Sequence, residues 1–171
     1  YLDLTKQEEA EYFLKLNDKK NLVSSIDMFK AELCAGDADS IAIQKMCKEI
    51  GITISKNHGD KGQCQFVGQI KQAFKKSPEN TMDALKFSYY MAKDEALSGI
   101  VFIGAFDLLQ HGIDMNKWSA KCYKSGAQTE IISNYNAIIK IDPQQGRYTA
   151  SRKAILRIIN KGLRRNKITI E

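Results

Sequence analysis

The residues best suited to chemistry by type and spacing are basic side chains near the end of the chain. Residues 150–166 are expected to form a helix capped by Thr149, and from residue 153 their Lys and Arg recur at i, i+4, i+8 and i+11, which places them along one helical face. Two more basic residues extend the row. Such a row suits a nucleic-acid backbone, where each neutralised phosphate releases counterions. The predicted nucleic-acid-binding residues are Lys153, Arg157, Lys161, Arg164, Arg165 and Lys167.

The net charge is concentrated in the same segment. The chain carries +6 at pH 7, and residues 140–171 hold nine Lys or Arg against two acidic residues. That segment therefore accounts for +7, and the rest of the chain for −1. The alternative to a binding role is a solvated basic face, which the negative end of the helix dipole favours. A partner of this segment should be acidic.

Other candidate residues give weaker indications of chemistry. Neither His58 nor His111 has Cys, Asp or Glu at metal-ligand spacing, and a charge at a helix end accounts for His111. The four cysteines form no CxxC pair, which predicts reduced, buried thiols in a cytosolic protein and no zinc site. Asp37 and Asp39 lack the rest of a calcium loop and fit a helix start. No catalytic motif or phosphate-binding loop occurs, so we expect no catalytic site and no cofactor within this chain.

Helices joined by short turns are expected to position these residues. Thr5 and Glu8 have the spacing of a capping box, Ser24 or Ser25 would cap the next helix, and Gly36 would end it. The stretch 96–109 is the most apolar; it is too short to cross a bilayer and is expected to be a buried central helix. Further helices are expected from Asp39 or Ser40 to Gly51, at 64–76, from Asn80 or Thr81 to Lys93, at 95–111, from Asp114 or Asn116, and at 127–141.

The pattern as a whole predicts an all-α fold, an irregular multi-helix bundle. We find no strand pairs and no internal repeat, although residues 52–55 could be extended and residues 1–4 could be the remnant of an N-terminal strand. Gln44, Cys47 and Gly51 echo the first helix and turn of a helix-turn-helix. A polar, glycine-containing loop follows where the recognition helix should be, so a plain helix ending at glycine is favoured.

One long stretch resembles a known family. Residues 2–54 read LDLTKQEEAEYFLKLNDKKNLVSSIDMFKAELCAGDADSIAIQKMCKEIGITI, which is similar to the segment after the DGQHR-type motif in ParB-like proteins of phages, plasmids and bacterial chromosomes. Residues beyond 60 resemble the family more loosely. The matching residues are Leu4, Thr5, Glu8, Glu9, Ala10, Phe13, Leu16, Asn17, Lys20, Val23, Ser24, Asp27, Phe29, Ala31, Ala35, Gly36, Asp37 and Ile43.

The resemblance implies that residues 1–22 end a ParB/sulfiredoxin-like domain whose motif lies upstream, and that residues 23–171 form a helical companion domain. Together with the basic row described above, it leads to the hypothesis of a cytoplasmic, DNA-associated protein that contacts the DNA backbone weakly and without sequence preference, through the C-terminal basic helix. Two alternatives stay open. One is a protein–protein or self-association module, which packs on the upstream domain or on a second copy. The other is the scaffold part of a ParB-like nuclease or nucleotide hydrolase. No membrane partner is expected.

Overall fold

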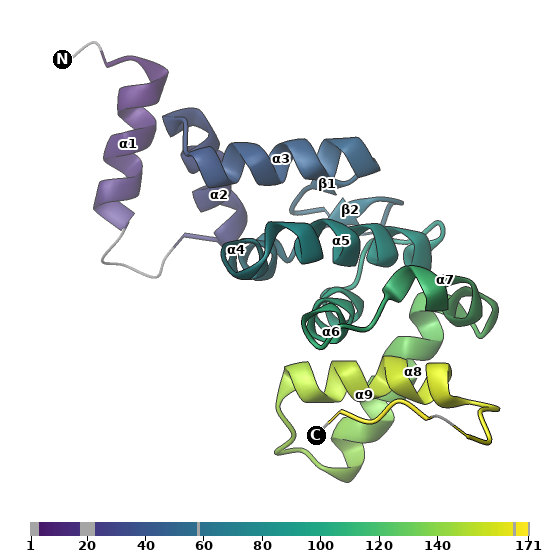
Figure 1. Cartoon of the computed structure of the whole chain (residues 1–171). Coiled ribbons are helices and arrows are strands. Elements are labelled where there is room, and N and C mark those ends of the chain that lie inside the picture. Colours follow the sequence, from purple (N-terminus) through teal and green to yellow (C-terminus); the bar gives the residue numbers. More distant parts are fainter. Residues whose placement is uncertain (1–3, 18–22, 58, 166, 171) are drawn as a thin grey trace.

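The structure, a computed structural model, describes residues 4–17, 23–57, 59–165 and 167–170 and is a bundle of helices (Figure 1). The predicted all-α fold is confirmed. None of the described helices is both long enough and apolar enough to span a membrane. The elements are α1 Lys6–Asn17, α2 Ser25–Ala35, α3 Ala38–Ile50, β1 Thr53–Ile54, β2 Gln63–Cys64, α4 Val67–Lys76, α5 Pro78–Ala92, α6 Gly99–Gln110, α7 Met115–Lys124, α8 Ala127–Ile141 and α9 Arg147–Asn160.

Side-chain caps fix where most helices begin. The predicted capping box is present, because the backbone N–H and the hydroxyl of Thr5 both donate to Glu8 Oε2 at 2.8 Å. Ser24 caps α2 as predicted. Two predicted starts are wrong: α3 begins after Asp37, which caps it, and α5 begins after Ser77. Pro at the first position of α5 suits the start of a helix, since its missing N–H would have no partner there.

One pair of short strands was not predicted. β1 and β2 pair in parallel, with Thr53 beside Gln63 and Ile54 beside Cys64. The expectation of no strand pair is wrong because two-residue strands are too short to show any alternation. After α3 comes β1 rather than a second helix, so the plain helix ending at Gly51 is confirmed. The predicted N-terminal strand falls mostly on residues 1–3, outside the described residues, and Leu4 is not in a strand.

The apolar helix α6 lies at the centre of the core. Its residues 101–106 are all buried, which confirms the prediction of a buried central helix. α6 packs against α5 on one side and α9 on the other. The contact with α9 is close at Gly104, where an added Cβ would lie 2.8 Å from the Ser151 carbonyl oxygen.

The last helix differs from its prediction at both ends. α9 follows Gly146 and ends at Asn160, so the predicted range of 150–166 and the Thr149 cap are wrong. Gly162 adopts φ 80°, a left-handed conformation that is typical just past a helix end. Leu163 therefore lies after the helix and is half-buried. The chain beyond α9 folds back as an extended tail (Figure 1).

Candidate nucleic-acid interface

Helix α9 has one buried and one exposed face, and it exposes two of the predicted cations. The buried face packs on α6 and α8. Lys153 and Arg157, four residues apart, are exposed. Arg152, by contrast, is 8% exposed, and its Nη1 donates to Asp107 Oδ2 of α6 at 3.1 Å. Its charge is therefore neutralised inside the bundle, whereas those of Lys153 and Arg157 face solvent.

The C-terminal end of α9 is held by a side chain of α7, Lys121, for which the sequence predicted no role. Lys121 of α7 donates from Nζ to the carbonyl oxygens of Ile159, at 2.6 Å, and Lys161, at 2.8 Å. A cation at this position satisfies free carbonyls and complements the negative end of the helix dipole. The contact anchors the turn that carries Lys161.

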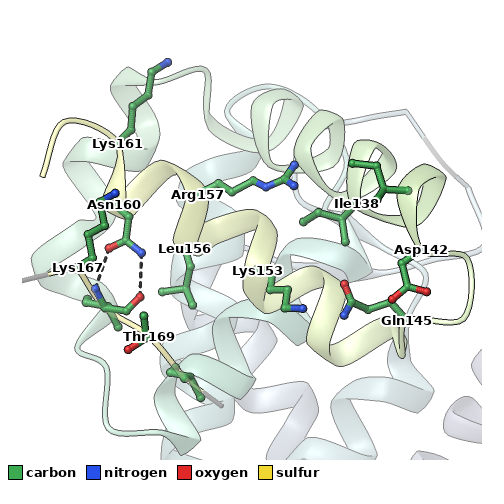
Figure 2. A pocket seen from close by; sticks show the side chains of 13 residues that line it. Ile138, Asp142, Gln145, Lys153, Leu156, Arg157, Asn160, Lys161, Lys167 and Thr169 are labelled. Carbon is green, nitrogen blue, oxygen red and sulfur yellow. Dashed lines mark hydrogen bonds between the residues drawn. The ribbon is translucent and has the colours of Figure 1, made fainter.

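Asn160 ties the tail to α9. Its Nδ2 donates to the Ile168 carbonyl at 2.8 Å, and its Oδ1 accepts from the Ile168 N–H at 2.9 Å, as Figure 2 shows. Both backbone groups of Ile168 are thus satisfied by one side chain. This Asn160 clasp brings Lys167 back beside the helix. The glycine in Asn160-Lys161-Gly162 was a local sign that the helix ends here. The sequence did not show that Asn160 would bind the backbone of Ile168.

These contacts enclose a pocket of about 720 Å³ between α8, α9 and the tail, here called the C-terminal hollow (Figure 2). Its lining is largely apolar, with cations from both α9 and the tail. Among the described residues that line it, Asp142 is the single acidic one. The lining residues are Ile138, Ile141, Asp142, Gln145, Lys153, Leu156, Arg157, Asn160, Lys161, Lys167, Ile168, Thr169 and Ile170.

The structure brings together four of the six predicted cations, but not as one helical stripe. Lys153 and Arg157 come from α9, Lys161 from its C-cap and Lys167 from the tail. Arg165 lines a different pocket, beside Trp118, and Arg164 is exposed in the same tail. The predicted stripe is wrong beyond Arg157 because the helix ends at Asn160.

The six cations are exposed and have no acidic partner within the described residues. The side chains of all six reach solvent, and none forms an ion pair with a residue that the structure describes. Exposed charges of one sign at one end of a molecule create a local positive potential, which attracts anions. This arrangement can bind a polyanion through several point contacts.

His111, the histidine that the structure describes, does not extend this interface. His111 follows α6, and its Nδ1 lies 2.7 Å from the Asp107 carbonyl oxygen, while its Nε2 lies 3.5 Å from Arg152 Nη1. Its position at a helix end agrees with the prediction. His58 lies outside the described residues.

The cysteines differ in burial. Burial raises the pKa of Cys47 and Cys64 to about 12 and that of Cys122 to about 11. Cys34 is exposed on α2, so the prediction of four buried thiols is wrong for this residue. All four are free thiols. Within the described residues no group of three His, Cys, Asp or Glu is arranged to hold a metal ion.

The chain was compared with protein families, with curated proteins and with solved structures. No family model, no curated protein and no solved structure matches the chain.

Proposed function

We propose that this chain is the helical part of a cytoplasmic ParB-like protein and that its C-terminal cations contact the phosphate backbone of DNA. The observation that carries the proposal is the set of six exposed cations at one end of the bundle, with no ion pair to any described residue. The resemblance of residues 2–54 to ParB-like proteins supports the choice of DNA as the polyanion.

The expected binding is indifferent to sequence. Phosphate contacts position a protein on a duplex but carry no base information. Sequence reading in the major groove would need an exposed helix or a two-stranded ribbon. Two of the six cations lie on a helix, α9, and the other four lie on the turn and tail beyond it. The proposal is therefore weak attachment to any duplex.

The test compares two variants with equal loss of charge. The first replaces the six C-terminal cations, Lys153, Arg157, Lys161, Arg164, Arg165 and Lys167, by Gln. The matched control replaces six exposed lysines on α2–α5 by Gln: Lys30, Lys45, Lys48, Lys75, Lys76 and Lys86. Binding to two duplexes of unrelated sequence is measured at low salt by fluorescence anisotropy.

We expect the parent and the control to bind both duplexes with similar affinity, and the C-terminal variant to lose most of its binding. Equal binding by both variants would show that net charge alone drives the attraction. No binding by the parent at low salt would refute the proposal.

The C-terminal hollow also favours a second function, a protein–protein or self-association module. Its apolar lining has no use in phosphate contact, since phosphate oxygens do not pack on Ile or Leu side chains. Apolar pockets edged by charge are typical of surfaces that bind other proteins.

A further inference from the structure

Helix α1 presents an acidic, apolar face to solvent. Tyr12 and Leu16 are 62% and 65% exposed. Because they lie four residues apart, they form one apolar patch on the helix. Glu8 lies one turn before Tyr12 in the same row, and Glu9 is exposed beside it. Ala10, on the other side of the helix, is buried. The exposed face of α1 therefore combines large apolar side chains with two carboxylates in its first turn and one cation, Lys15, in its last turn.

The C-terminal hollow has the complementary character. Of its apolar lining residues, Ile138 and Leu156 are 5% and 7% exposed, whereas Ile141 is 78% exposed. Figure 2 shows Lys153 and Arg157 on the part of α9 that lines the hollow. Contiguous exposed apolar surface edged by charge marks interaction sites. The hollow thus suits an occupant that is apolar in the middle and acidic at its edges.

We propose that the C-terminal hollow binds the exposed face of α1 from a second copy of this chain. Tyr12 and Leu16 would cover the apolar lining, and Glu8 and Glu9 would face Lys153 and Arg157. The carboxylates of α1 are opposite in charge to the cations of the hollow, and both surfaces mix apolar with charged side chains, so the two surfaces are complementary.

The arrangement of the molecule makes this contact head-to-tail. α1 lies at one end of the bundle and α9 at the other, so one copy cannot fill its own hollow (Figure 1). A contact between two different surfaces leaves one of each free on a dimer, and it continues into a ring or an open chain. DNA would contact the same cations, so a phosphate backbone and α1 exclude each other at one hollow. The inference does not depend on the DNA proposal, because it rests on the apolar lining and on α1.

The test uses two variants of the full chain whose changes are at exposed side chains and so spare the core. The α1 variant carries Tyr12→Ser and Leu16→Ser. The hollow variant carries Ile141→Ser and Arg157→Glu. Sedimentation velocity over a wide range of concentration measures the mass of the parent, of each variant and of an equimolar mixture.

We expect the parent to form species larger than a dimer as concentration rises. Each variant alone should associate at least roughly ten-fold more weakly, because apolar contact area is lost. The mixture should form a one-to-one heterodimer and stop there, since the α1 variant retains a hollow and the hollow variant retains α1. That result would distinguish head-to-tail contact from other pairing.

Three results would overturn the inference. A parent that stays monomeric would show that the two surfaces do not associate. A hollow variant that still self-associates like the parent would indicate pairing of α1 with α1. A mixture without heterodimers would show that the surfaces are not partners. DNA binding is a separate measurement, and we expect Tyr12→Ser with Leu16→Ser to leave it unchanged at protein concentrations below those at which the parent self-associates.

A charge reversal tests the acidic edge. Glu9→Lys should weaken self-association, and combining it with Arg157→Glu in one chain should restore it in part, because the opposite charges face each other again. The control is Glu49→Lys, at an exposed site on α3. An equal effect of the control, or no restoration in the double variant, would contradict the proposed pairing.

Discussion

Asp37 shows how a single residue both starts a helix and gives the fold a dependence on pH. Its Oδ1 accepts a hydrogen bond from the Ser40 N–H at 2.8 Å and so caps α3. The hydrogen bonds from the backbone and the side chain of Ser40 lower the pKa of Asp37 below its ordinary value of 3.8. A lowered pKa means that the charged cap stabilises the fold above pH 3.8 and that this contribution is lost as pH falls through the folded-state pKa.

Asp37→Asn should therefore flatten the pH dependence of stability on the acid side. Asparagine also caps helices well, so the variant should be nearly as stable as the parent at neutral pH. Urea unfolding at about pH 6 and about pH 3 measures the difference, which should be larger in the parent than in the variant. Equal acid sensitivity of the two proteins would show that the Asp37 charge does not contribute.

For single residues, the sequence predicts correctly those whose contacts are with near neighbours in the chain. The Thr5–Glu8 box and the glycine at the end of α2 depend on neighbours within a few positions, and both are present. Cys34 was predicted to be buried, but which side of α2 is covered is decided by α1, α4 and α3, which pack against it, and not by the helix itself.

Among the elements, the crossing of α6 and α9 sets the position of the candidate interface. Gly104 allows the two helices to approach, since a Cβ there would lie 2.8 Å and 2.9 Å from Ser151 backbone atoms. Gly104→Ala should destabilise the protein by about 1–3 kcal/mol through overpacking. The control is Gly146→Ala, where φ is −57° and nothing lies within 4 Å of an added Cβ.

Urea unfolding of both glycine variants measures the effect. We expect a clearly lower midpoint for Gly104→Ala and a nearly unchanged midpoint for Gly146→Ala, because alanine restricts the unfolded chain but is a poorer N-cap for α9 than glycine. A Gly104→Ala protein as stable as the parent would mean that the helices separate without cost.

The Asn160 clasp gives a second prediction about an element, the tail. Asn160→Ala removes both hydrogen bonds to Ile168 and should cost about 1–3 kcal/mol of local stability. Amide hydrogen exchange should then become faster at Ile168, and DNA affinity should fall although no charge is lost, because Lys167 is no longer held beside α9. Unchanged exchange at Ile168 would contradict the role of the clasp.

Helix periodicity predicted α8 correctly at 127–141, but it extended α9 by six residues beyond its end. Basic residues after Asn160 continue a helical spacing, so the pattern alone does not show the break. Gly162 was the local signal that could have revealed it. The return of the tail depends on a contact between residues eight positions apart and has no periodic signature.

For the whole molecule, the sequence located the positive charge at the C-terminal end but not its arrangement. The six predicted cations are exposed, as a binding surface requires. The C-terminal hollow and its apolar lining were not foreseen, because they form only when α8, α9 and the tail meet. Membership of the ParB-like family stays a prediction.

The most direct test of the DNA proposal is the salt dependence of duplex binding. Log affinity is measured against log salt concentration for the parent, the six-site C-terminal variant and the six-lysine control on α2–α5. Each phosphate contact contributes about 0.9 to the slope. We predict a steep slope for the parent and the control, and a slope reduced by about 0.9 per lost contact in the C-terminal variant. The same slope for both variants would contradict the assignment of these six residues.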